Sequence, residues 1–317
     1  YDFPIDYSNF REKNWFVVAA GQSATFDGLW FTSNWGDWGG TINVKGGAGQ
    51  TVPCYVRNCR FVGLRACGYT ESAHANCDNY LIGCKFFGGM TAPIAFSSSL
   101  IIQDCEISGV QLGGDNYGGV IRANGSGATI TGCTITHCVQ KNAHASNRTA
   151  VLFGGQWGCC DMKETVVSNC LAFATSTGKI GLFGCGNSVV EKCLFVNNRE
   201  NVKVSGGAVY SMTVAANGRS TAHGDPLAID GCTFVSNTLH AAALDGGTAG
   251  ECALGIVGTF GYTKNYTAVV NSSFYGNVVE MEPSETVTAL KSRGVLEDAI
   301  VGNMGSLGVV NCVFGGA

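Results

Sequence analysis

Charged residues and proline are scarce in this chain of 317 residues. Lys, Arg, Asp and Glu make up 13% of it, and the formal net charge is -4. Because no basic patch is present, we expect no nucleic-acid partner. The longest apolar runs, at 15–20 and 150–153, are far too short for a membrane-spanning helix. With only 5 prolines, nearly every backbone N–H can join a sheet.

Cysteine and glycine are abundant instead, with 16 and 46 residues. Many cysteines belong to one recurring pattern: an apolar residue, two further residues, Cys, one residue, then an aromatic or aliphatic residue. The anchor cysteines of this pattern are Cys59, Cys84, Cys105, Cys133, Cys170, Cys193, Cys232 and Cys312. Leu29 and Ser272 take the anchor position in two further copies. The ten anchors lie 21 to 40 residues apart, a spacing typical of repeat architectures.

Each copy of the pattern predicts a short β-strand with one buried face. The residue after the anchor is often polar, as Lys85 and Glu106 are, while its neighbours on both sides are apolar. Gly or Asn stands before most anchors and indicates a bend. These features predict an all-β fold, a right-handed parallel β-helix of about ten coils over residues 24–317. Residues 1–23 are predicted to form a short N-terminal cap or docking arm.

The eight anchor cysteines are expected to form an inward ladder of free thiols. Cys is small and buries readily, and stacked strands hold equivalent Cβ atoms about 4.8 Å apart, more than the roughly 3.8 Å of a disulfide. A row of identical ligands in a dry core provides no tetrahedral metal site. The remaining cysteines are Cys54, Cys67, Cys77, Cys138, Cys159, Cys160, Cys185 and Cys252. One or two disulfides among these would suit an exported protein.

An apolar stripe on the outer surface is the candidate interface. Leu171, Leu194 and Val313 follow their anchors in a row that is otherwise mostly polar. Since soluble proteins usually cover such stripes, we expect residues 199–225 or a neighbouring subunit to lie over it. The segment 309–317, which includes Phe314, reads as an uncapped coil, for which we expect further chain or another copy as the cover.

Candidate catalytic residues are few. Glycoside hydrolysis needs two facing carboxylates, and Glu191 with Asp230 is the nearest pair on neighbouring repeats; two solvated surface acids are the alternative. The five histidines show no spacing for a metal site or a nucleophile's base. We therefore predict no catalytic residues, no metal and no cofactor. Trp30, Trp35 and Trp38 either stack on a sugar or pack in the N-terminal cap.

Location is indicated by two features of the sequence. The N-glycosylation acceptor pattern occurs at Asn124, Asn147, Asn265 and Asn271. Together with the cysteine content, these patterns favour an extracellular or cell-surface location.

A second motif carries a resemblance to a known family. Phe-x-x-Asn occurs at Phe31-Thr-Ser-Asn34, Phe195-Val-Asn-Asn198, Phe234-Val-Ser-Asn237 and Phe274-Tyr-Gly-Asn277, and Gly-Gly-Ala-Val occurs at Gly206 to Val209. In alternating these two motifs the chain resembles chlamydial polymorphic outer-membrane proteins and related autotransporter passengers. Several coils lack one or both motifs. The resemblance implies a β-helical scaffold and leaves the activity open, because one fold serves many functions.

Taken together, these features predict a non-enzymatic, exported structural or adhesive protein, such as a stiff spacer or a fibre subunit assembling head to tail. Its expected partners are further copies of itself or another surface protein, with a glycan as a further candidate. The alternative is a carbohydrate-active enzyme or sugar-binding module, with its site in the insertions at 60–80, 108–128, 138–166 or 235–265.

Overall fold

The structure, a computed structural model, describes part of the chain. The described residues are 15–32, 40–45, 52–64, 67–72, 78–90, 92–96, 99–112, 119–123, 127–143, 150–154, 160–174, 179–184, 188–205, 209–217, 226–245, 252–260, 266–282, 296–298, 301–303 and 306–316. All regular elements within these ranges are β-strands, as the sequence predicts.

The strands form four sheets, which we call A to D in the order in which the chain visits them. Sheet A consists of β1 (Phe16–Val18), β4 (Gly40–Lys45), β7 (Cys67–Ser72), β10 (Ile94–Phe96), β14 (Ile121–Ala123), β18 (Ala150–Gly154), β22 (Lys179–Gly184), β26 (Val209–Asn217), β30 (Cys252–Phe260), β34 (Leu296–Asp298) and β35 (Val301–Asn303). Sheet B consists of β2 (Thr25–Asp27), β5 (Tyr55–Arg57), β8 (Asn79–Ile82), β11 (Leu100–Gln103), β15 (Ala128–Thr131), β19 (Cys160–Lys163), β23 (Ser188–Glu191), β27 (Pro226–Asp230), β31 (Tyr266–Val270) and β36 (Ser306–Val310).

The other two sheets complete the coil. Sheet C consists of β3 (Trp30–Thr32), β6 (Arg60–Val62), β9 (Lys85–Phe87), β12 (Glu106–Ser108), β16 (Thr134–Thr136), β20 (Val166–Ser168), β24 (Leu194–Val196), β28 (Thr233–Val235), β32 (Ser273–Tyr275) and β37 (Val313–Gly315). Sheet D consists of β13 (Gln111–Leu112), β17 (Val139–Ala143), β21 (Leu171–Ala174), β25 (Arg199–Ser205), β29 (Thr238–Asp245) and β33 (Val278–Met281).

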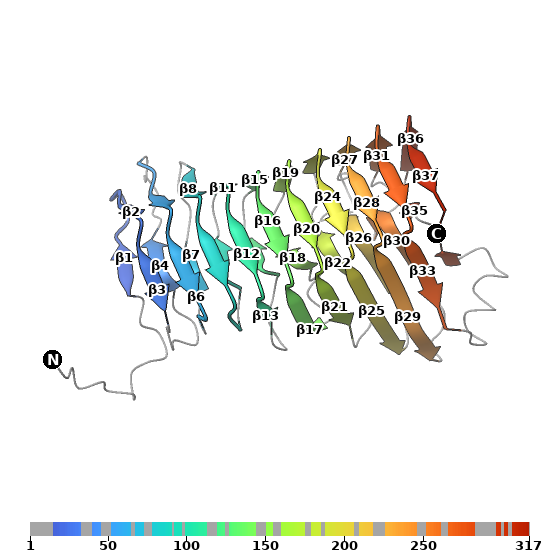
Figure 1. Ribbon diagram of the computed structural model, residues 1–317, viewed down its shortest axis with the longest axis horizontal. Coiled ribbons are helices and arrows are strands. Elements are labelled where there is room, and N and C mark those ends of the chain that lie inside the picture. Colours follow the sequence, from blue (N-terminus) through green and yellow to red (C-terminus); the bar gives the residue numbers. More distant parts are fainter. Residues whose placement is uncertain are drawn as a thin grey trace.

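Each strand pairs in parallel with the equivalent strand of the next coil. In sheet B, for example, Ile102 pairs with Leu81 on one side and with Ile130 on the other. Sheets B and C each contain ten strands, one for each coil. Figure 1 shows the sheets running along the long axis of the molecule, from β1 near the N-terminal side to β37 near the C-terminal side. The predicted parallel β-helix of about ten coils is therefore confirmed.

The first coil begins earlier than the sequence predicts. Strand β1 lies in the segment assigned to the cap, yet Phe16 pairs with Ile42 of β4. The Phe16 ring packs edge-on against Phe26 and Phe31, with ring centroids 5.4 and 5.9 Å apart. The regular coils therefore start at Phe16, because its ring extends the inner face of the β-helix. Residues 1–14 of the predicted cap lie outside the described residues.

One anchor is misassigned by the sequence pattern. Val166 pairs with Thr134 and with Leu194, so Thr165 takes the anchor position of that coil. Cys170 lies five residues later, at the corner between sheets C and D, level with Cys138. The prediction that Cys170 belongs to the anchor ladder is wrong. Both corners have the same local form, a residue with positive φ followed by an inward side chain, so their sequence frames look alike.

The bends before the anchors explain the recurring Gly-Cys and Asn-Cys pairs. In all ten coils the residue before the anchor has φ between 48° and 67°; these residues are Gly28, Asn58, Gly83, Asp104, Gly132, Glu164, Lys192, Gly231, Asn271 and Asn311. Gly and Asn adopt this left-handed conformation most readily. At Gly132 a Cβ would also lie 2.5 Å from Oδ1 of Asp104, so the Asp104 side chain would have to move.

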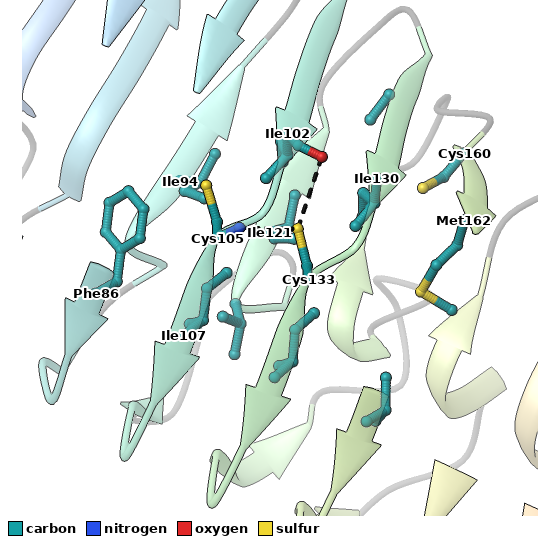
Figure 2. Close-up of a cluster of buried hydrophobic side chains, with 14 of the residues drawn as sticks. Phe86, Ile94, Ile102, Cys105, Ile107, Ile121, Ile130, Cys133, Cys160 and Met162 are labelled. Carbon is teal, nitrogen blue, oxygen red and sulfur yellow. Dashed lines mark hydrogen bonds between the residues drawn. The ribbon is translucent and has the colours of Figure 1, made fainter. Parts of the chain in front are cut away.

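Rows of equivalent side chains fill the core. Two residues after the anchor, the Phe61 and Phe86 rings stack with centroids 4.6 Å apart, and Phe234 stacks in the same way on Phe195 and Phe274 at 4.8 Å each. Figure 2 shows the row passing from Phe86 to Ile107, with Cys105 and Cys133 pointing into the core. Such rings bury large apolar areas, and each stacked pair adds about 0.5–1.5 kcal/mol.

Candidate functional site

The best-defined side-chain chemistry lies at the corner between sheets B and C, where the anchor thiols and hydroxyls bond to the adjacent coil. On either side of Cys105, the backbone N–H groups of Asp104 and Glu106 donate to carbonyl groups of the neighbouring coils at 3.0 and 2.9 Å. The N–H of Cys105 itself donates to Sγ of Cys133 at 3.4 Å. The Cys133 thiol in turn donates to the carbonyl of Ile102 at 3.6 Å (Figure 2). Each such thiol thus satisfies backbone groups that the turn removes from the sheet.

Two residues with a hydroxyl group form equivalent hydrogen bonds to the backbone at this corner. Oγ1 of Thr165 accepts from the N–H of Cys133 at 3.3 Å and donates to the carbonyl of Lys163 at 2.9 Å. Oγ of Ser272 accepts from the N–H of Cys232 at 3.1 Å and donates to a carbonyl at 2.8 Å. Nine of the ten anchors are therefore small side chains that can both donate and accept, and Leu29 in the first coil is the exception.

Nine of the described cysteines carry free thiols. They are Cys59, Cys84, Cys105, Cys133, Cys138, Cys170, Cys193, Cys232 and Cys312, all buried except the half-buried Cys312. Cys54 and Cys160 are also buried, and Cys67 is half-buried. Hydrogen bonds to neighbouring thiols, together with burial, raise the pKa of Cys105 and of Cys170 well above the usual range. Because the thiolate is the reactive form, Cys105 and Cys170 are poor nucleophiles. Cys77, Cys159, Cys185 and the side chain of Cys252 lie outside the described part of the chain.

A ladder of asparagines occupies the corner between sheets C and D. Oδ1 of Asn237 accepts from the backbone N–H and from Nδ2 of Asn198, at 3.1 and 2.9 Å. Nδ2 of Asn237 donates to the carbonyl of Phe195 and to Oδ1 of Asn277, at 2.9 Å each. These are the Asn residues of the Phe-x-x-Asn motifs, whose Phe residues form the stacked row. The motif thus joins adjacent coils through both of its defining residues.

The predicted apolar stripe has a different composition in the structure. Leu194 stands in the outward row of sheet C next to Val166, whereas Leu171 lies in sheet D between Val139 and Arg199. The prediction that Leu171 and Leu194 share a row is wrong, because it depended on the misassigned anchor at Cys170. Leu171 and Leu194 are both half-buried.

Exposed hydrophobic side chains gather at the two ends of the β-helix. In the last described coil, Val309, Val313 and Phe314 are 42%, 52% and 52% exposed. In the first coil, Phe16 and Leu29 are 41% and 40% exposed. Of the fourteen large exposed hydrophobic residues in the described part, only Met90, Phe173 and Val189 lie well away from the ends. The ends are therefore the most apolar surfaces of the described molecule.

The two acids of the candidate pair are adjacent in the structure, but lysine side chains form ion pairs with one of them. Glu191 pairs with Asp230 across sheet B. Hydrogen bonds and ion pairs with Lys192 and Lys163, at 3.2 Å each, lower the pKa of the Glu191 carboxyl. Oδ1 of Asp230 accepts from Nδ2 of Asn271 at 2.9 Å. Glu191 is thus held ionised, which does not suit the proton-donating role of a general acid.

Only some of the candidate glycosylation and sugar-stacking residues lie in the described part of the chain. Asn271 is exposed at a bend, whereas Asn124, Asn147 and Asn265 lie outside the described residues, as do Trp35 and Trp38. The Trp30 side chain is 68% exposed, with the Arg60 guanidinium 5.4 Å from the centre of its ring. Within the described ranges, no three or more His, Cys, Asp or Glu side chains are placed to bind a metal ion. This part of the chain also contains no helix that could span a membrane.

No family model, curated protein or solved structure matches this chain.

Proposed function

We propose that this protein is a non-enzymatic, exported structural or adhesive β-helix and that its copies associate head to tail. The observation that carries the proposal is the unbroken parallel register of sheets B and C through ten coils. The recurring polar side chains are used within this register: the anchor thiols and hydroxyls bond coil to coil, and so do the corner asparagines. A chain whose repeated polar groups hold adjacent coils together is suited to be a stiff spacer.

Head-to-tail association is supported by the composition of the two ends. The inner positions Val309 and Phe314 are half-exposed at one end, and Phe16 and Leu29 at the other. In the last pairing of sheet C, Phe314 stacks on Phe274 with ring centroids 4.9 Å apart. A further coil carrying an apolar residue at this position would continue the row. The contact joins different surfaces of the two copies, so it propagates into a filament unless it closes into a ring.

The test is assembly of the 317-residue chain and of variants at its last coil. We expect sedimentation velocity and electron microscopy to show linear particles that lengthen with concentration, and Phe314→Glu to abolish them. Val189→Glu is the matched control, because Val189 is 37% exposed in strand β23 of sheet B, well away from both ends. Circular dichroism checks that both variants remain folded. A chain that stays monomeric at high concentration would overturn the head-to-tail part of the proposal.

A carbohydrate-active or sugar-binding role is the second candidate. It is favoured by the pairing of Glu191 with Asp230 on one outer face and by the exposed Trp30. Depolymerisation assays on acidic plant and algal polysaccharides distinguish the two candidates. Cleavage that is lost in Asp230→Asn would support the enzyme and displace the structural proposal.

A further inference from the structure

A carboxyl group lies in the core of the β-helix, in strand β7 of sheet A. Glu71 is 4% exposed, and its position in the inner row is fixed by its partner Val44, which is fully buried. On the other side of β7, Ile94 pairs with Tyr69, which places the buried Phe96 level with Glu71. Glu71 is therefore stacked between two apolar side chains of the adjacent coils.

The Glu71 carboxyl has few hydrogen-bonding partners. The hydroxyl of Tyr69, itself fully buried, donates to Oε2 of Glu71 at 3.1 Å. Oδ1 of the buried Asn79 accepts from the N–H of Cys54 at 2.8 Å. Oε1 of Glu71 and Nδ2 of Asn79 both lack a hydrogen-bond partner within ordinary bonding distance. One hydrogen bond leaves an ionised carboxylate in this place far less well solvated than in water.

The described groups around Glu71 supply no positive charge. Facing it from β4 and β10 are Val44 and Phe96, and from the corner at β8 comes Asn79. The titratable groups nearby are Tyr69, in the same strand, and the thiol of Cys54, next to Asn79. No described Lys, Arg or His forms an ion pair with Glu71. Burial raises the pKa of Glu71 to about 7, although Asn79 and Tyr69 oppose the shift.

We infer that Glu71 is a pH-sensitive switch within the core: its uncharged carboxyl packs between coils, and its ionisation loosens β7 from β4 and β10. This inference does not depend on the structural role proposed above. The group binds its proton more tightly in the folded chain than in the unfolded chain. Its contribution to stability is therefore complete below the ordinary pKa of glutamate and is lost as the pH rises through about 7. Over this window the unfolding equilibrium constant rises by roughly tenfold per pH unit.

The experiment compares the full chain with its Glu71→Gln variant. Glutamine keeps the shape of the carboxyl and cannot ionise. We expect the urea midpoint of the wild-type chain to fall between pH 5 and pH 8, and amide exchange in residues 67–72 to accelerate beyond the intrinsic effect of pH. Both changes should be much smaller in Glu71→Gln. Glu106→Gln is the matched control, since Glu106 is partly exposed and pairs with Lys85 at 3.0 Å; it should keep the wild-type pH profile.

A direct titration keeps the inference testable even if Glu71→Gln does not fold. Carbon-13 NMR of the glutamate carboxyl groups in the wild-type chain should show one resonance with a midpoint near pH 7. A Glu71 midpoint near 4.5 would overturn the inference. So would identical pH profiles for the wild-type chain and folded Glu71→Gln.

Discussion

Replacing Asn237 by alanine tests whether the corner asparagines hold the coils together. The side chain of Asn237 forms hydrogen bonds with the coil on each side. Alanine removes the acceptor of the buried Asn198 N–H and the donor to the carbonyl of Phe195. Nδ2 of Asn198 also loses Asn237 as an acceptor but keeps the carbonyl of Val167. The substitution also removes one of the two donors to Oδ1 of Asn277, which keeps the N–H of residue 237 as a partner.

The expected loss of stability follows from these groups. An orphaned buried N–H costs about 1–3 kcal/mol, and each of the two donated bonds contributes about 0.5–1.5 kcal/mol. Because the three effects share one network, they do not simply add. We expect Asn237→Ala to lower the free energy of unfolding by about 2–5 kcal/mol.

The assay combines urea unfolding with amide exchange of β24 and β32, the strands of sheet C in the coils before and after Asn237. Exchange should accelerate most in these two coils, since a repeat protein loses cohesion locally. Asn201→Ala is the matched control, because Oδ1 of Asn201 accepts only an exposed bond from Nε of Arg199 at 3.1 Å. It should change stability by no more than about 0.5 kcal/mol. Equal effects of the two substitutions would refute the role assigned to the ladder.

Three further predictions concern the anchors and their bends. Cys105→Ser should be tolerated better than Cys105→Ala in thermal melts, because serine retains the acceptor and donor as Ser272 does in its own coil; a more stable alanine variant would contradict this. Glu164→Gly should stabilise the chain by about 0.5–1 kcal/mol in urea, since Glu164 has φ 48°, and no gain would show that the bend is unstrained. In thiol labelling of the native chain, the half-buried Cys312 should react before the buried Cys105, and labelling of Cys105 at the same rate would contradict the buried ladder.

The fold was accessible from the sequence because two local signals recur together. An inward residue at every anchor and a second inward residue two positions later give the period of a strand, and Gly or Asn supplies the bend. These signals predicted the parallel coils. They failed at Thr165, where the anchor is a hydroxyl, and at Cys170, where a second corner has the same local pattern. Only the pairing of Val166 with Thr134 distinguishes the two corners.

The buried carboxyl was beyond the sequence pattern for a different reason. Residues 60–80 were read as a polar insertion, whereas 67–72 form the regular strand β7. Tyr69 and Glu71 lie two positions apart with a polar residue between them, and this spacing fits the alternating pattern of a strand. It could not reveal that Glu71 faces inward, because a charged residue is normally placed on the solvent side. The partners of Glu71 come from sheets formed by residues distant in sequence, and local pattern does not report them.

The equivalence of the last coils has a consequence for how the chain folds. Asn198, Asn237 and Asn277 offer the same donors and acceptors. Each of their coils also has a Phe two residues after its anchor, and these anchors lie 39 and 40 residues apart. During folding, a strand of one coil can therefore pair with the coil after next, and its corner asparagine still finds hydrogen-bond partners. Lengthening the closed loop in this way costs little, since doubling its length adds only about 0.6 kcal/mol. The central coils differ more, because the inner row changes there from Phe86 to Ile107, so coil skipping should arise at the C-terminal coils.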